Sequence, residues 1–268
     1  MIDQRLIKVR NDESRYDPIN TVNLSGISNQ NALGRLLRLP LKLIPPGMVV
    51  PILQGELRGR KWVCGSSDHG CWLGSYEYYK QKLFARRVSP GDVVLDVGAH
   101  VGFYTLLAST LVGKDGKVIA FEPMPGNLIY LRRHLKLNRI DNVRVIDAAV
   151  SDAEGSAWFE KGASSSMGGI SQTGDFEVRA VSIDALISRG EIPIASLIKM
   201  DIEGGEYRAL LGARTLLTEH HPTIFLATHG RDVHKSCCDY LSSLGYTLSP
   251  VVGESVAETD EIIACFDE

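Results

Sequence analysis

The chain has 268 residues, of which 44% are hydrophobic and 23% are charged, and its formal net charge at pH 7 is −3. This composition is ordinary for a globular protein, and the length allows one large domain or one domain with an extension. The isoelectric point of about 6.2 argues against a broadly basic phosphate-binding surface, so no nucleic-acid partner is predicted. No apolar run is long enough to span a membrane, and the five cysteines do not resemble a disulfide framework, which favours the reducing cytoplasm.

The first 88 residues are predicted to form an N-terminal α+β extension. Residues 1–28 are polar and irregular, whereas residues 31–44 mix leucine with arginine and lysine. That mixture fits a helix at a membrane surface or a short helix packed on the main domain. Pro40 and Pro45 would shorten any helix and favour the second interpretation.

Two further elements are expected in the extension. Residues 48–64 are typical of two short strands around a turn. Residues 75–88 have helical spacing, with Tyr76, Tyr79, Leu83 and Phe84 predicted on one side.

From residue 89 onward, apolar strand-like runs alternate with helix-like segments. Strands are predicted at residues 93–98, 117–123, 143–150, 196–204, 223–229, 246–248 and 262–266, and helices at 103–112, 127–138, 206–220 and 233–245. This alternation predicts an α/β domain over residues 89–268 with a doubly wound, mostly parallel sheet. Ligands of such sheets bind at the carboxyl ends of the strands.

A glycine turn directly follows the first of these strands. Asp96, Gly98 and Gly102 give the spacing Gly-x-x-x-Gly, which departs from the Gly-x-Gly-x-x-Gly of dinucleotide-binding turns. The acidic residue suits a cationic ligand better than a phosphate. An amino-acid tail would match, with its ammonium near the carboxylate and its carboxylate near free N–H groups.

The next two strand ends complete a nucleoside-binding pattern. Glu122 ends the second strand, where an acid accepts hydrogen bonds from ribose hydroxyls. The third strand ends in Asp147-Ala148-Ala149, whose small side chains leave room for a flat base. Together the three ends predict an S-adenosylmethionine site. An NAD-dependent oxidoreductase on the same sheet is the alternative.

Several motifs in order resemble the FkbM family of S-adenosyl-L-methionine-dependent methyltransferases. They are VLDVGAHVGFYT at 94–105, AFEP at 120–123, DAAVSD at 147–152, VSIDAL at 181–186 and IKMDIEGGE at 198–206, preceded by GCWLGSYE at 70–77. The resemblance implies a Rossmann-like class I methyltransferase sheet. It also implies O-methylation of a hydroxyl on a sugar or secondary metabolite, with S-adenosyl-L-homocysteine as the second product.

The cofactor contacts follow from the strand ends and from the matching motif positions. They are expected to be Asp96, Gly98, Ala99, His100, Gly102, Tyr104, Thr105, Glu122, Pro123, Asp147, Ala148 and Ala149, with Tyr76 and Glu77 closing one wall from the extension.

Three residues at the fourth and fifth strand ends are the catalytic candidates. Lys199 and Asp201 are two apart, so in a strand they point to the same side. Asp201 could be the general base, bind the cofactor ammonium, hold a divalent cation with Glu203 or His229, or cap the next helix. His229 is the second candidate for the base. Family members often place a glutamate shortly before this histidine, and this chain has Ala227-Thr228 there.

The remaining expectations concern metals and partners. No zinc site is predicted because cysteine pairs at usable spacing are missing, and a divalent cation is possible but not predicted. The expected partner is a small molecule that carries a hydroxyl, with no nucleic acid and no membrane. N-methylation of a small molecule or nucleic acid is an alternative, and the oligomeric state is open, with a homodimer possible.

Overall fold

A computed structural model describes residues 21–23, 43–161, 168–171 and 176–267. The helix expected over 31–44 lies outside these residues, apart from its last two positions. None of the described helices combines the length and apolar character needed to cross a bilayer.

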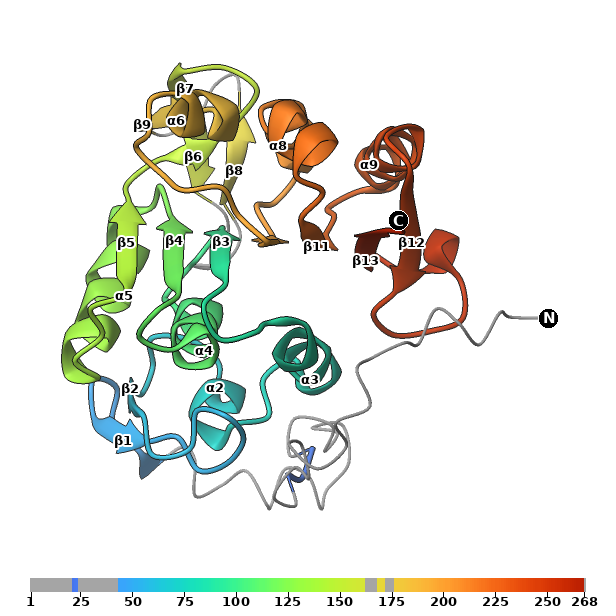
Figure 1. Cartoon of the computed structure of the whole chain (residues 1–268). Helices are drawn as coiled ribbons and strands as arrows, with labels where there is room; N and C mark the ends of the chain where they lie inside the picture. The colour runs from blue at the N-terminus through green and yellow to red at the C-terminus, as the bar shows by residue number, and fades with distance from the viewer. Residues whose placement is uncertain (1–20, 24–42, 162–167, 172–175, 268) are drawn as a thin grey trace.

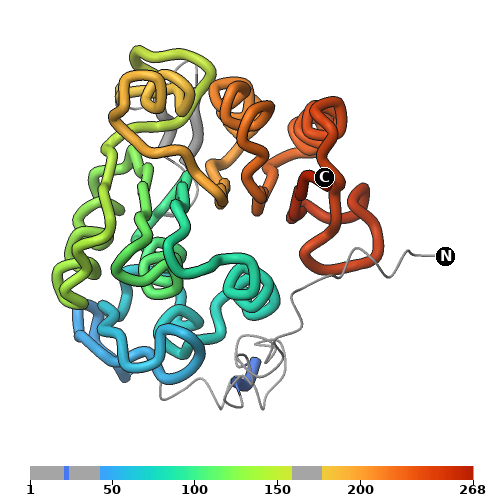
Figure 2. The backbone as a smooth tube through the Cα atoms, viewed as in Figure 1, coloured from blue at the N-terminus to red at the C-terminus, as the bar shows by residue number. Residues whose placement is uncertain are grey.

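A seven-stranded sheet forms the centre of the molecule. Its strands are β3 (Val93–Val97), β4 (Lys117–Phe121), β5 (Val143–Ile146), β10 (Leu197–Met200), β11 (Thr223–Ala227), β12 (Tyr246–Pro250) and β13 (Glu261–Phe266). The strand order is β12-β13-β11-β10-β3-β4-β5, and β13 runs antiparallel to the other six strands. The order reverses between β3 and β10, which confirms the doubly wound α/β fold. In Figure 2 the two sheet edges are formed by segments far apart in the chain, β5 in green and β12 in red.

Helices cover both faces of this sheet. α3 (Tyr78–Arg87), α4 (Phe103–Val112) and α5 (Pro125–Leu137) pack on one face, and α6 (Ile183–Ser188), α7 (Glu206–Leu211), α8 (Arg214–Glu219) and α9 (Arg231–Ser243) pack on the other. A short 3₁₀ helix at Val256–Glu258 precedes β13. Because side chains alternate along a strand, Val94 joins one apolar cluster while Leu95 and Val97 join the other.

The predicted third strand, at residues 143–150, is interrupted. β5 ends at Ile146, and Ala149–Val150 forms β6 in a separate four-stranded sheet with β7 (Gly155–Lys161), β8 (Gly168–Ser171) and β9 (Phe176–Val181). The prediction of one continuous strand was therefore wrong, because the chain leaves the large sheet after β5. Figure 1 shows the small sheet and α6 at one end of the molecule, with β1, β2 and α2 at the other.

The extension contains the two predicted strands, β1 (Val49–Pro51) and β2 (Lys61–Val63), followed by a short helix α2 (His69–Leu73). The helix predicted from residue 75 begins at Tyr78, because Glu77 before it takes a left-handed backbone with φ 44°. The predicted apolar side was wrong for Tyr79, which is 57% exposed. The buried residues of α3 are Lys80, Gln81, Phe84 and Ala85.

The helix predicted over residues 206–220 is divided into α7 and α8. Gly212 lies at the break, and a Cβ there would be 2.0 Å from the carbonyl oxygen of Ser151. The Asp184 carboxylate accepts hydrogen bonds from the backbone N–H groups of Thr215 and Leu216 at 2.7 and 3.0 Å. Asp184 therefore caps the start of α8, and the absence of a side chain at Gly212 allows the close approach to Ser151 at the break.

Candidate active site

A cavity of about 350 Å³ opens where β3, β4, β10 and β11 end. This is the place where doubly wound sheets bind ligands, and the volume is in the range of small-molecule sites. The carboxylate-bearing residues of its lining are Glu77, Glu122, Asp201, Glu203, Asp260 and Glu261. Lys199 is the one lysine among the residues that line it. The charge of the lining therefore favours a cationic ligand.

Gly98 makes the sharp turn after β3. Its φ is +79°, and a Cβ at this position would lie 1.9 Å from the carbonyl oxygen of Asp201. Only glycine fits both the backbone conformation and the close approach. The turn therefore lies directly against the end of β10 and brings the two central strand ends to one side of the cavity.

The N–H groups of this turn are already bonded within the protein. Gly98 and Ala99 both donate to the carbonyl of Phe121, at 3.0 and 2.9 Å. His100, which has a left-handed backbone with φ 50°, donates its N–H to Glu122 Oε2 at 2.8 Å. The expectation of free N–H groups for a ligand carboxylate was therefore wrong at these three positions.

Glu122 is buried and held in one orientation. Its Oε1 accepts hydrogen bonds from the N–H of Met124 at 2.8 Å and the side-chain amide of Asn127 at 3.2 Å, while Oε2 accepts from His100. Burial raises the pKa of Glu122. An ionised carboxylate has about four lone-pair positions, so a ribose hydroxyl still has an acceptor at this strand end.

The end of the third strand contributes only part of what was predicted. Ala148 and Ala149 line the cavity, whereas Asp147 is half-exposed and forms an ion pair with Arg132. The carboxylate of Asp147 therefore has a partner on the protein surface.

Asp96 and Lys199 form a buried pair across β3 and β10, where the two residues are in register. Lys199 Nζ lies 3.4 Å from Asp96 Oδ1 and donates to the carbonyl of Gly98 at 2.8 Å. Thr105 donates to the other Asp96 oxygen at 2.6 Å. The predicted cofactor residues outside the cavity lining are Asp96, Gly102, Thr105 and Asp147.

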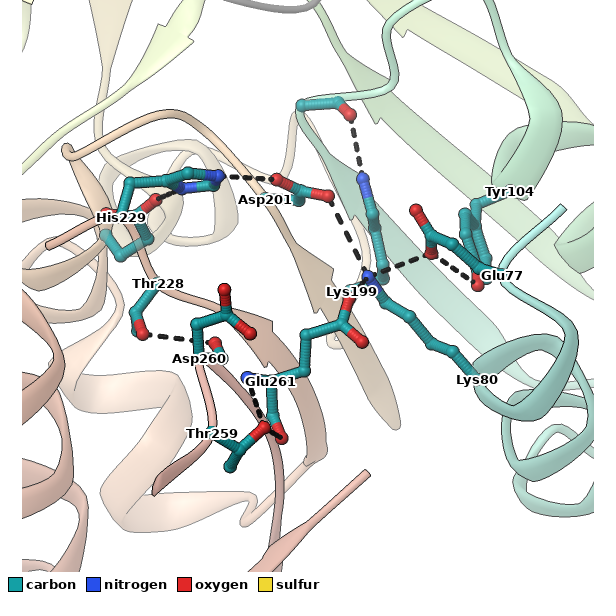
Figure 3. Close-up of polar contacts among 12 residues, drawn as sticks. Glu77, Lys80, Tyr104, Lys199, Asp201, Thr228, His229, Thr259, Asp260 and Glu261 are labelled. Atoms are coloured by element: carbon teal, nitrogen blue, oxygen red, sulfur yellow. Dashed lines mark hydrogen bonds and ion pairs between the residues drawn. The ribbon is translucent and has the colours of Figure 1, made fainter. Parts of the chain in front are cut away.

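A second buried lysine, Lys80 of α3, joins three elements at the cavity (Figure 3). Its Nζ lies 2.6 Å from Glu261, 3.0 Å from Glu77 and 3.8 Å from Asp201. Glu77 also accepts a hydrogen bond from the Tyr104 hydroxyl at 2.9 Å. Burial alone would lower the pKa of Lys80, but the three carboxylates raise it. Lys80 is therefore a fixed positive charge beside Asp201.

Asp201 is held as a carboxylate. Burial would raise its pKa, but Lys199, Lys80 and His229 lower it below the ordinary value. The residue at the N-cap of α7 is Gly205, so Asp201 does not cap that helix. A carboxylate with a lowered pKa is a weak proton acceptor and a good partner for a cation.

His229 follows the end of β11 and faces acids on both ring nitrogens. Nδ1 lies 2.7 Å from Glu206 Oε1, while Nε2 lies 3.6 Å from Glu203 and 3.7 Å from Asp201. The hydrogen bond to Glu206, aided by the other two acids and opposed by burial, raises the pKa of His229 to about 8. The imidazole is 35% exposed. Among the residues with described positions, no group of three or more His, Cys, Asp or Glu residues is arranged to hold a metal ion.

The three catalytic candidates therefore lie together in the lining, with Gly98, Ala99, His100, Tyr104, Glu122, Pro123, Ala148, Ala149, Tyr76 and Glu77. Sequence reasoning missed Asn127, Thr228, Asp260 and Glu261 of the lining, and Lys80 beside it. Lys80 occupies an ordinary helical position and Glu261 begins β13, a strand that lies between β12 and β11, so no local pattern distinguishes them. Position alone, just after β11, could have indicated Thr228.

Comparisons with known proteins agree with this arrangement. The family model of the methyltransferase FkbM domain matches residues 96–248. A hexuronic acid methyltransferase, AglP of Haloferax volcanii, is 28% identical over 138 residues, which are 51% of this chain and 56% of that protein. Protein-L-isoaspartate O-methyltransferase 2 of Archaeoglobus fulgidus is 42% identical over 71 residues, which are 26% of this chain and 30% of that protein.

Both alignments thus span less than two thirds of the relative's own length. The crystal structure of a methyltransferase FkbM from Methylobacillus flagellatus superposes with a TM-score of 0.50 at 18% identity, covering 75% of this chain and 56% of that one. At that identity the superposition supports the fold.

Proposed function

Because this chain belongs to the FkbM family of S-adenosylmethionine-dependent methyltransferases, we propose that it methylates a hydroxyl group of a small molecule, and specifically of a sugar. The family match argues against the alternative of an NAD-dependent oxidoreductase. The proposal depends on the position of His229. This histidine lines the cavity, and its Nε2 lies beside Asp201.

The cavity residues suit the cofactor. Glu122 would accept from the ribose hydroxyls, and Ala148 and Ala149 leave space for the adenine. The carboxylates of Glu77 and Asp201 would lie toward the positive charges of the cofactor. Because the N–H groups of the glycine turn are bonded within the protein, the turn would shape the cavity wall and would not bind the carboxylate of the cofactor.

When bound, the cofactor would supply an electrophilic methyl group on positively charged sulfur, and that sulfur would keep the electron pair of its bond to the methyl carbon. The protein must align the acceptor and remove its proton. His229 is the base in this proposal, because a pKa of about 8 is close to neutral pH whereas the pKa of Asp201 is lowered. The acceptor O–H bond breaks, its electron pair enters the new bond and its proton goes to Nε2.

Two observations support a sugar as the acceptor. AglP, with which the chain shares 28% identity, is named for methylation of a hexuronic acid. Asp260 and Glu261 line the cavity together with His229, and their carboxylates can accept hydrogen bonds from hydroxyls.

The first test is binding and transfer. Calorimetry with S-adenosylmethionine and NAD measures cofactor choice, and only the former is expected to bind. The protein is then incubated with cofactor labelled in the methyl group and with glucuronic acid, galacturonic acid and their neutral hexose counterparts, and methyl ethers are identified by mass spectrometry. His229→Asn should retain cofactor binding and lose transfer. Transfer to amines alone would contradict the proposal and favour N-methylation.

A further inference from the structure

Glu206 is a buried carboxylate that the reaction as written above does not use. It begins α7, its side chain is fully buried, and its Oε2 has no hydrogen-bond partner. Its Oε1 accepts from the N–H of Gly204 at 3.0 Å and lies 2.7 Å from His229 Nδ1. Burying a charge with one oxygen unpaired costs free energy, so a role beyond packing is indicated.

The geometry fixes where the imidazole hydrogen lies. As a carboxylate, Glu206 can only accept hydrogen bonds, so His229 Nδ1 carries the hydrogen that joins them. The lone pair of the neutral ring is then on Nε2. Glu203 and Asp201, at 3.6 and 3.7 Å from Nε2, lie beyond ordinary hydrogen-bond distance, so Nε2 remains open toward the cavity.

We propose that Glu206 is the positioning residue of the reaction: it keeps the hydrogen of neutral His229 on Nδ1 and directs the Nε2 lone pair at the acceptor hydroxyl. The inference rests on the proposed function, in which His229 is the base. When Nε2 takes the proton, the imidazolium stays hydrogen-bonded to Glu206 and is stabilised by its charge. The ring is partly exposed, so the proton can then pass to solvent.

The other charged groups around the imidazole act differently. Asp201 and Glu203 face Nε2 and also favour the protonated ring, and Lys199 and Lys80 lie near Asp201. None of these four contacts Nδ1. Glu206 alone among the acids facing the ring can therefore select between the two neutral forms of the imidazole.

The alternative is that Glu206 has a purely structural role, in which its hydrogen bond to Gly204 serves only to hold the turn before α7. Glu206→Gln separates the two roles, because glutamine keeps the shape and an acceptor oxygen for both N–H groups but removes the charge. Glu203→Gln is the matched control, since it removes a carboxylate from the Nε2 side and leaves Nδ1 with its partner.

The direct test follows His229 itself and needs no acceptor. Histidine-labelled full-length protein with S-adenosylhomocysteine bound is titrated by NMR, and the signal is assigned with His229→Asn. In the wild type the ring is expected to titrate near pH 8 with hydrogen on Nδ1 when neutral. In Glu206→Gln the midpoint should fall by about one pH unit, as expected for loss of an adjacent charge. Glu203→Gln should shift it less and leave the neutral form unchanged.

The kinetic test uses an acceptor from the methyl-transfer screen. The acid limb of kcat/KM should move to lower pH in Glu206→Gln, and Glu206→Ala should lower kcat about 100-fold with the cofactor Kd unchanged. If Glu206→Gln leaves both the NMR midpoint and the acid limb in place, the role of Glu206 is overturned. If His229→Asn retains wild-type transfer, the proposed base is wrong instead, and the two failures are distinguishable.

Discussion

At the scale of single residues, we propose different roles for the two charged groups of the cavity, with Asp201 facing the cofactor and His229 facing the acceptor. Lys199 and Lys80 lower the pKa of Asp201, whereas the hydrogen bond to Glu206 raises the pKa of His229. Asp201→Asn should therefore weaken S-adenosylmethionine binding about 10- to 100-fold, the usual range for a charged hydrogen bond, measured by calorimetry. His229→Asn is the control and should bind the cofactor nearly as wild type. Equal weakening in both variants would contradict this division.

Gly98 is the residue for which the backbone argument is strongest. In Gly98→Ala, the new side chain would sit on a backbone with positive φ, and its Cβ would lie 1.9 Å from the carbonyl oxygen of Asp201. The turn after β3 and the end of β10 would therefore have to move apart. The cost should be about 3 kcal/mol or more in the free energy of unfolding. Gly91→Ala is a matched control, since its φ is +89° with nothing within 4 Å of the added Cβ. Urea titration compares them, and similar losses would show that φ alone matters.

At the scale of secondary-structure elements, Lys80 connects α3 to β13 and to the end of β10. Lys80→Met removes the buried cation and leaves three carboxylates close together, which should cost about 3–5 kcal/mol of stability. Lys235→Met, which breaks the solvent-exposed pair between Lys235 and Asp239, should leave the free energy of unfolding nearly unchanged. Chemical denaturation measures both. A small loss in Lys80→Met would mean that the carboxylates take up protons without penalty.

The features of the fold and of the cavity that depend on neighbouring residues could be predicted from the sequence. Apolar runs predicted the parallel strands, and the residues at or just after their carboxyl ends predicted Glu122, Lys199, Asp201 and His229 at the cavity. The features that it did not predict depend on contacts between distant segments. Gly212 at the helix break lies against Ser151, and Lys80 pairs with Glu261, which is 181 residues away. No window of neighbouring residues contains such information.

At the scale of the whole molecule, His134 joins the extension to the sheet domain. Its buried ring stacks on Trp62 at 3.9 Å, accepts from the N–H of Val63 at Nε2, and donates from Nδ1 to the carbonyl of Val101. Burial lowers the pKa of His134 to about 4. An unfolded histidine binds its proton near pH 6.5, so between pH 6.5 and 4 the unfolded state holds more protons.

Stability should therefore fall as the pH falls through this window, by up to about 1.4 kcal/mol per pH unit for this one proton. His134→Asn should make the slope shallower, whatever its stability at neutral pH. His100, whose pKa burial also lowers to about 4, should leave a residual slope. Urea titrations at several pH values measure the slopes, and an unchanged slope in the variant would contradict the assignment to His134.

The extension and the sheet share one apolar core, and this determines how the molecule should unfold. Trp62 and Phe84 are fully buried and contact Phe103, Tyr104 and Phe225 of the α4 face. A boundary at residue 88 stays a prediction from sequence, but no separate core is available to stabilise the described part of the extension alone. In a Trp158→Phe variant the remaining tryptophans are Trp62 and Trp72 of the extension. Tryptophan fluorescence of this variant and far-UV circular dichroism, which reports the helices, should give coincident urea transitions. Separate midpoints would show that the extension folds as an independent unit.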